Sequence, residues 1–430
     1  MSPVEIGRDG EAGMRGGQAL GRQFGWLWGA YTVSAIGTWL AFDAFSLIAV
    51  IVLHAGATEV AALSAAGLAV GAVVATPLGP WMEFRRKRPV MMFMDLLRCG
   101  VLLTIPVAFA LDALTFVQLL VVSVVVGAAD IGFTAASGAF VKSLLPPEDL
   151  LAANARFEAT QWTATILGPP LGGAAMGLFG PVMTVVANAV SFLLSAVGIR
   201  AIGGTETHPG RPASASGRAP AGSLLEGWRY ILAHPTLRPM FFNTVLYNAL
   251  IMVSLPLLAV LMVGDLGFAA WQYGLAFSVP SIGGLIGSRL ARRLVPRFGE
   301  RRVLLVAGTL RACWPVGLAF VGRGTAGLAL VMVVELGVIV SCAVFNPVYS
   351  TIRLQQTDPG RVARTLSAWS VTTKATTAAM TALWGLLAGL TGPRAAIAVA
   401  GVLVLATPLL LPRRIEDPAE MAQPSIDEAA

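Results

Sequence analysis

The chain has 430 residues, of which 56% are hydrophobic and only 12% are charged, and its formal net charge is +7 at pH 7. Soluble domains average about 25% charged residues, so a soluble protein of this composition would need an implausibly large core. The basic residues lie in short blocks between apolar stretches without interleaved aromatic residues, which argues against a nucleic-acid partner and favours contact with the anionic lipids of a bilayer.

Apolar stretches follow one another along the chain, and each is close to the ~20 residues that a helix needs to cross a bilayer. They are expected to be helices because a strand edge in hydrocarbon would leave backbone groups unpaired. The sequence therefore predicts an all-α membrane protein with twelve transmembrane helices. The predicted spans are residues 26–53, 60–81, 90–111, 114–140, 157–179, 182–202, 240–263, 271–290, 303–321, 326–349, 366–390 and 395–411.

The loops between these spans alternate between strongly basic and almost free of Lys and Arg. Residues 85–88, 142–156 and 289–302 are basic, whereas the intervening loops carry only Arg323 and Arg394. Lys and Arg accumulate on the cytoplasmic side of membrane proteins. The alternation therefore predicts a multi-pass protein of the cytoplasmic (inner) membrane with both termini in the cytoplasm.

A change of composition divides the chain. Residues 203–223 are rich in Gly, Pro, Ser, Ala and Arg, which is typical of a flexible linker, and residues 224–234 have the pattern of a short amphipathic helix at the membrane surface. The predicted units are an N-terminal cytoplasmic arm (1–25), a six-helix bundle (26–202), a linker with the amphipathic helix (203–235), a second six-helix bundle (236–412) and a cytoplasmic tail (413–430).

The two halves resemble each other. Residues 84–88 follow the second span as residues 298–302 follow the eighth, and Arg98 in the third span matches Arg311 in the ninth. The shared spacing predicts a six-span unit used twice, so that two pseudo-symmetric bundles meet at a central cavity. That is the geometry of alternating-access transporters.

Several charged residues lie inside the predicted spans, where each costs about 2.5–3.5 kcal/mol near the bilayer centre. Asp43, in the first span, is a candidate proton acceptor, or alternatively a structural partner of Lys374 in the eleventh. Asp130 and Glu335 could bind a proton or a cationic substrate, or could instead make hydrogen bonds between helices. The candidate proton- or substrate-binding residues are therefore Asp43, Asp130, Glu335 and Lys374.

After the second span, residues 79–89 read Gly-Pro-Trp-Met-Glu-Phe-Arg-Arg-Lys-Arg-Pro. This segment resembles the loop Gly-x-Leu-Ala-Asp-Arg-x-Gly-Arg-Arg/Lys of the major facilitator superfamily, with Glu83 in place of Asp and Arg86 in place of the second Gly. Nearly the whole chain is similar to its drug-efflux branch, which includes macrolide-efflux and enterobactin-exporter-like proteins. The resemblance implies that this loop latches the two halves through charge pairs.

Asp95 and Arg98 are three residues apart and share one helical face. We expect them to join the loop in a charge network at the cytoplasmic end rather than to form a substrate site. The predicted gating motif consists of Gly79, Glu83, Arg85, Arg88, Asp95 and Arg98.

In the fifth span, residues 168–173 read Gly-Pro-Pro-Leu-Gly-Gly. The Pro residues kink a helix and the Gly residues let a neighbour approach closely. This segment is similar to the core of the motif associated with antiporters in the superfamily, which implies an antiporter-type motif at Gly168, Pro169, Gly172 and Gly173. The alternative interpretation is a kinked, closely packed helix of any polytopic protein.

The sequence has no phosphate-binding loop and no Gly-x-Ser-x-Gly elbow, and His54, His208 and His234 lie in separate loops. We therefore expect neither an enzyme nor a bound metal or cofactor. The predicted function is a monomeric secondary active transporter that exports a small amphipathic molecule (a drug, antibiotic, secondary metabolite or siderophore), with protons as the coupling ion. The alternatives are a uniporter or importer of the same fold and a non-transporting membrane sensor.

Overall fold

The computed structural model describes residues 21–41, 43–67, 69, 86–146, 149–203, 222–358 and 361–412, and helices joined by short turns make up most of them. Eight segments are long and apolar enough to cross a membrane. The predicted all-α membrane fold is therefore confirmed. The eight segments are Gly21–Ile51, Lys87–Ala110, Phe116–Val141, Pro181–Arg200, Leu237–Asp265, Glu300–Phe320, Gly324–Gln355 and Pro393–Leu410.

The N-terminal half begins with one span that is interrupted after Leu40. The second predicted span is helical over residues 57–67, and most of its remainder lies outside the described residues. The labelled helices of this half are α1 (Gly21–Leu40), α2 (Ala44–Ile51), α4 (Lys87–Ala110), α5 (Phe116–Leu144), α6 (Leu150–Phe179) and α7 (Pro181–Arg200).

The C-terminal half repeats this order after the linker, and its eighth predicted span is a compound helix in which a 3₁₀ turn containing Pro280 joins two α-helical pieces. Its elements are α8 (Gly222–Ala233), α9 (Leu237–Ala259), η2 (Val260–Asp265), α10 (Ala270–Ser278), η3 (Val279–Ser281), α11 (Ile282–Phe298), α12 (Glu300–Cys313), η4 (Pro315–Phe320), α13 (Gly324–Gln355), α14 (Val362–Thr391), α15 (Pro393–Ala406) and η5 (Thr407–Leu410).

The amphipathic helix predicted in the linker is present as α8, and it packs on the C-terminal half. The Trp228 indole donates a hydrogen bond to the Thr372 hydroxyl at 2.8 Å, and Arg364 pairs with Glu226 at 2.6 Å. Gly227 lies so close to the start of α14 that a Cβ would stand 2.6 Å from the Arg364 carbonyl oxygen. These contacts fix α8 to α14.

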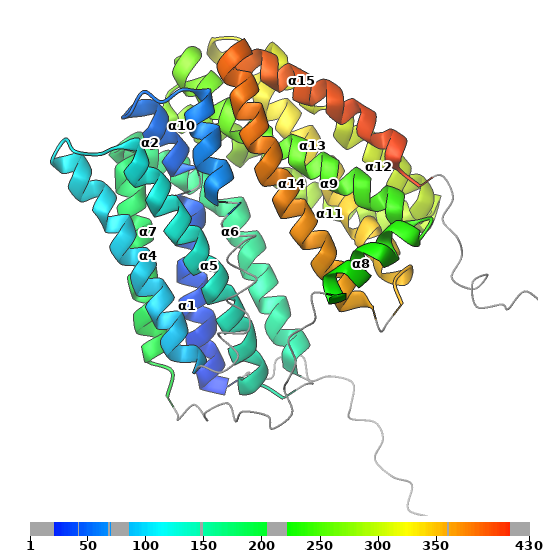
Figure 1. The fold of residues 1–430 in the computed structure, drawn as a ribbon, viewed down its shortest axis with the longest axis horizontal. Helices are drawn as coiled ribbons and strands as arrows, with labels where there is room; N and C mark the ends of the chain where they lie inside the picture. The colour runs from blue at the N-terminus through cyan, green and yellow to red at the C-terminus, as the bar shows by residue number, and fades with distance from the viewer. Residues whose placement is uncertain are drawn as a thin grey trace, which may run out of the picture.

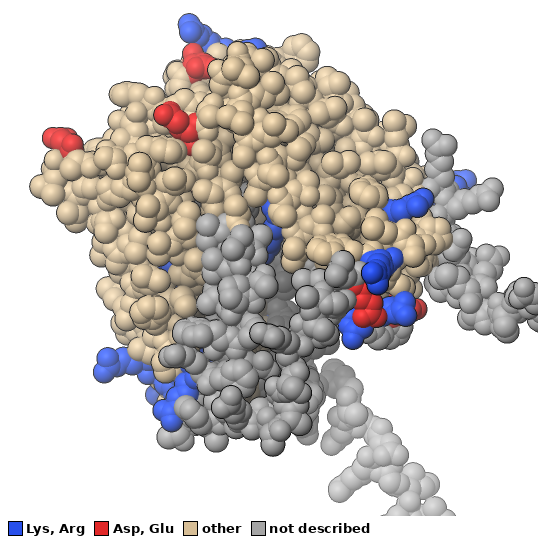
Figure 2. Space-filling view, viewed as in Figure 1, with Lys and Arg blue, Asp and Glu red and all other residues tan. Residues whose placement is uncertain are grey.

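The two ends of the helices differ in charge. We call the end with the turns near residues 145–149, 203, 299 and 356–361 the basic end, and the end with the turns near residues 53–56, 111–115, 180, 266–269, 321–323 and 392 the short-turn end. Figure 2 shows Lys and Arg gathered toward the basic end, beside a broad belt of uncharged residues. This belt is the surface that a bilayer would cover.

The buried apolar residues form one shared core at the short-turn end and two separate cores at the basic end. The shared core joins residues of both halves, such as Ile48 and Leu257. At the basic end, one cluster around Met91 belongs to the N-terminal half and another around Phe345 belongs to the C-terminal half. The helices of the two halves accordingly diverge from the short-turn end in Figure 1.

Candidate functional site

The first span breaks at Asp43, between α1 and α2. Asp43 has φ 57° and ψ 16°, a left-handed conformation that Asp tolerates better than most residues, and its side chain does not cap α2. The carboxylate accepts a hydrogen bond from the Tyr273 hydroxyl of α10, with 2.5 Å between Oδ2 and the phenol oxygen. Tyr273 is 1% exposed. This hydrogen bond therefore joins the two halves at a buried tyrosine.

The glycines of the antiporter-type motif pack around this bond. A Cβ on Gly168 would lie 2.9 Å from the backbone of Trp39, and one on Gly172 would lie 3.0 Å from the carbonyl carbon of Leu40. On the other side of α6, a Cβ on Gly173 would lie 2.7 Å from the Cα of Gly274. The motif thus holds α6 against the end of α1 and against α10 beside Tyr273, and Pro169 is buried between these glycines.

Further contacts join the halves at the short-turn end. The Thr58 hydroxyl donates a hydrogen bond to the carbonyl oxygen of Gly385 at 2.8 Å. A Cβ on Gly177 would stand 2.7 Å from the Cβ of Trp271, and one on Gly264 would stand 3.6 Å from a Val50 methyl group. The Asp43–Tyr273 bond is therefore the polar centre of a closely packed contact between the halves.

Glu335 lies on α13, partly buried, within electrostatic reach of Tyr273 and of Tyr247 on α9. Among the described residues, none donates a hydrogen bond to its carboxylate. Asp43 thus hydrogen-bonds to Tyr273, and Glu335 of the other half acts on the same tyrosine by its charge. A shared role of these two carboxylates stays a prediction.

Lys374, the alternative partner predicted for Asp43, does not pair with it among the described residues. It is exposed on α14. The structure supplies Tyr273 in its place, which sequence reasoning missed. The available signal was a tyrosine hydroxyl inside an otherwise apolar predicted span, a group that needs a hydrogen-bond partner when it is buried.

Arg98 is the centre of a separate charge network in the N-terminal half. It is 2% exposed, pairs with Asp95 on its own helix, and pairs with Asp130 of α5 at 2.9 Å. Its guanidinium also lies over the rings of Phe133 and Phe192, at 4.8 and 4.1 Å from their centroids. Asp130 thus makes an inter-helix ion pair, while its side chain is 62% exposed.

Of the remaining gating-motif residues, the structure describes Arg88. Arg88 donates a hydrogen bond to the carbonyl oxygen of Ile202, at the end of the sixth span. Gly79, Glu83 and Arg85 lie outside the described residues, so a charge latch at this loop stays a prediction.

Arg311 occupies the equivalent position in the C-terminal half, also 2% exposed, but without carboxylates. Its guanidinium lies 3.9 Å from the Tyr247 ring centroid and 3.5 Å from that of Phe345, and it donates to Asn243 Oδ1 at 2.6 Å. Asp95 stands three residues before Arg98, whereas Gly308 stands three residues before Arg311. Across the described residues no acid pairs with Arg311, so the repeated unit keeps the cation and its aromatic neighbours but not its counter-charges.

The difference between these two arginines predicts a difference in stability. Arg98→Met leaves Asp95 buried without a cation, which we expect to cost about 3–5 kcal/mol. Arg311→Met removes the same cation from a matched aromatic site and leaves no carboxylate behind, so we expect a smaller loss. Thermal unfolding of the two purified variants checks this prediction, and equal losses would contradict it.

The family model described as Major Facilitator Superfamily matches residues 27–352. An uncharacterised MFS-type transporter, y4rN of Sinorhizobium fredii, is 25% identical over 231 residues, which cover 52% of this chain and 54% of that protein. The match thus spans about half the length of that relative.

Solved transporters share the fold. The nucleoside transporter NupG is 11% identical, with a TM-score of 0.69 over 90% of this chain and 98% of that one. A bacterial homologue of the iron transporter ferroportin in an inward-facing state is 20% identical, with a TM-score of 0.70 over 92% and 100%. A POT family transporter in complex with 5-aminolevulinic acid is 12% identical, with a TM-score of 0.68 over 90% and 95%. At sequence identities this low, the similarity to these transporters shows a shared fold and nothing about the substrate.

Proposed function

The chain belongs to the major facilitator superfamily of membrane transporters, and from this premise we propose that it is a secondary active exporter of small amphipathic molecules driven by proton antiport. The observation that carries the proposal is the hydrogen bond between Asp43 and Tyr273 of opposite halves, with Glu335 within electrostatic reach of the same tyrosine. A carboxylate at a moving interface can bind a proton in one conformation and release it in another.

The proposed direction of transport depends on which end faces the cytoplasm. The positive-inside rule places the basic end there. The shared core at the short-turn end and the separate cores at the basic end then correspond to an inward-facing state. The likeness to a ferroportin homologue in an inward-facing state supports this assignment.

Asp43 is proposed to couple the proton to the conformational switch. A hydrogen bond donated by Tyr273 favours the ionised carboxylate, so closing the short-turn end favours release of the proton toward the basic end. Opening the short-turn end breaks this bond and favours proton uptake from outside. Each proton that enters down a potential of 100 mV supplies about 2.3 kcal/mol for export.

Glu335 is proposed to bind the substrate or to assist the proton step. Within the described part of the chain, its carboxylate has no hydrogen-bond donor and no ion-pair partner, so it is available to a cationic or hydrogen-bonding group of the substrate. Because Glu335 and Asp43 both act electrostatically on Tyr273, we propose that a cation bound at Glu335 opposes proton binding at Asp43 through this tyrosine. Such competition is what antiport requires.

Proton coupling is tested in inverted membrane vesicles that carry a pH-sensitive dye and are supplied with ethidium, Hoechst 33342 or erythromycin. We expect one of these probes to collapse the pH gradient with the parent protein and not with Asp43→Asn. Asp265→Asn, which changes an exposed carboxylate at the short-turn end, serves as the matched control and should behave like the parent. Equal transport by Asp43→Asn and the parent would rule out the proton role.

The same vesicles separate the alternative functions. A uniporter or importer would move a probe without dissipating the pH gradient. A sensor would bind a probe without any flux into proteoliposomes.

A further inference from the structure

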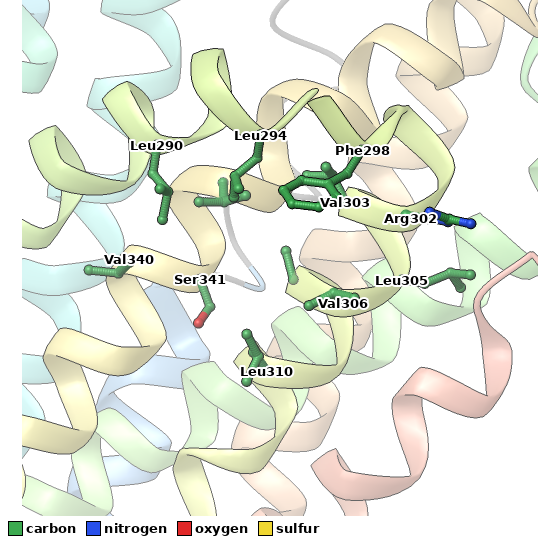
Figure 3. Close-up of a pocket in the computed structure, with 12 residues that line it drawn as sticks. Leu290, Leu294, Phe298, Arg302, Val303, Leu305, Val306, Leu310, Val340 and Ser341 are labelled. Carbon is green, nitrogen blue, oxygen red and sulfur yellow. The ribbon is translucent and has the colours of Figure 1, made fainter. Parts of the chain in front are cut away.

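An apolar groove lies on the side of the C-terminal half, away from the contact between the halves. Its volume is about 440 Å³, and α11, α12 and α13 form its walls, as Figure 3 shows. Arg302 and Ser341 are the two polar residues among the twelve that line it. The other ten are Leu290, Leu294, Phe298, Val303, Leu305, Val306, Ala307, Leu310, Val340 and Val344.

The groove opens sideways, toward the bilayer. Val306 is 60% exposed, and Leu290, Phe298 and Leu310 are exposed as well, whereas Val303 forms part of a buried floor. The described neighbours of α12 are α11, α13, α15 and short turns of the same half. An apolar surface that faces outward at this depth is in contact with lipid chains.

Positive charge lies along α11 beside the groove and at the end of the groove that Arg302 lines. Residues 289–302 contain six arginines and one glutamate, which gives a net charge of +5 (6 − 1). All six arginine side chains are exposed. Arg302 lines the groove, and the Arg297 guanidinium lies 5.5 Å from the ring centroid of Phe298, which also lines it. Guanidinium groups bind phosphate through paired hydrogen bonds.

The length of the groove matches one leaflet. Along α12 it extends from Arg302 to Leu310, which is about 12 Å of helix. Arg302 stands near the start of the membrane-crossing segment Glu300–Phe320, at the level of lipid headgroups. A leaflet contributes about 15 Å of hydrocarbon, so a chain whose phosphate lies beside Arg302 would follow the groove over most of its depth.

We propose that this groove binds an anionic glycerophospholipid, with its phosphate on Arg302 and Arg297 and one acyl chain against Val306 and Leu310. The arginines select the negative headgroup, and the apolar walls hold the chain. Basic pockets between transmembrane helices on the cytoplasmic side commonly bind such headgroups.

Native mass spectrometry of the delipidated full-length protein tests the proposal, with phosphatidylglycerol and phosphatidylcholine of identical acyl chains as probes. We expect discrete phosphatidylglycerol adducts, and Arg302→Gln should lower their occupancy about fivefold relative to the parent. Arg323→Gln, which changes an exposed arginine at the opposite end, is the matched control and should leave the occupancy unchanged.

Two further experiments test whether the lipid lies in the groove. Val306→Trp extends a bulky side chain along the groove and should lower the occupancy of both lipids, while thermal unfolding without lipid stays close to that of the parent. Inorganic phosphate should not displace phosphatidylglycerol, because it gains nothing from the apolar walls. Equal binding of the two lipids, equal effects of Arg302→Gln and Arg323→Gln, or displacement by phosphate alone would each overturn the proposal.

Discussion

Joining Gly177→Cys to Trp271→Cys by a disulfide is expected to stop transport, and reduction is expected to restore it. Gly177 lies near the end of α6 and Trp271 near the start of α10, and the two positions come from different halves. A Cβ on Gly177 would stand 2.7 Å from the Trp271 Cβ. If the two helices move apart by about 1 Å, the Cβ–Cβ distance falls in the range found in disulfides.

The size of this effect follows from alternating access. The disulfide fixes the halves together at the short-turn end, whereas transport requires that end to open. Among ethidium, Hoechst 33342 and erythromycin, the probe that the parent transports fastest is used. We expect its flux in proteoliposomes to fall by about tenfold or more under oxidation, because only uncrosslinked molecules can cycle. Cys99→Ser, Cys313→Ser and Cys342→Ser are introduced first, so that the native cysteines do not react.

The matched control places a disulfide inside one half. A Cβ on Gly287 of α11 would lie 2.6 Å from the Cβ of Ala343 on α13, so Gly287→Cys with Ala343→Cys has nearly the same geometry. This crosslink should form and leave transport intact, because the C-terminal bundle moves as a unit. Persistent flux with Gly177→Cys crosslinked to Trp271→Cys would mean that the contact at the short-turn end does not need to open.

The architecture was accessible from the sequence because hydrocarbon imposes strong rules. Long apolar stretches must be helical in a bilayer, and alternating basic loops order them. Even the amphipathic helix near Trp228 was predictable from its composition. Boundaries were less accurate, since α6 begins at Leu150, seven residues before the span predicted to start at residue 157. The first seven residues of α6 include Asn154 and Arg156, which lower the local hydropathy below that of a membrane span.

The site was only partly predictable. The cost of burying a charge identified Asp43 and Glu335 one at a time, but nothing in the spacing of one chain shows that helices about 230 residues apart bring Tyr273 to Asp43. The same limit applies to Asp130, whose partner Arg98 is on a neighbouring helix. Pairing across helices depends on which faces meet, and the glycines at 168, 172 and 173 decide that by their close contacts.

Tyr273→Phe is expected to shift the protein toward the state in which the short-turn end is open. The substitution removes the hydroxyl and so deprives the Asp43 carboxylate of its hydrogen bond to the other half in the closed state. A hydrogen bond to a charged group contributes about 1.5–3 kcal/mol, so the closed population should fall relative to the open one by about 10- to 150-fold. Transport should fall too, because return to the inward-facing state becomes unfavourable.

Spin labels on Ala113→Cys and Arg323→Cys, at short turns of opposite halves, report this shift as a longer distance by double electron–electron resonance. Tyr349→Phe is the matched control: its hydroxyl donates to the Met240 carbonyl within one half, at 3.2 Å, so the distance should not change. Asp43→Asn keeps an acceptor for Tyr273 while removing the charge, so it should move the label distance less than Tyr273→Phe but abolish the proposed proton coupling. If both variants lengthened the distance equally, the charge of Asp43, rather than its hydrogen bond, would be what holds the short-turn end closed.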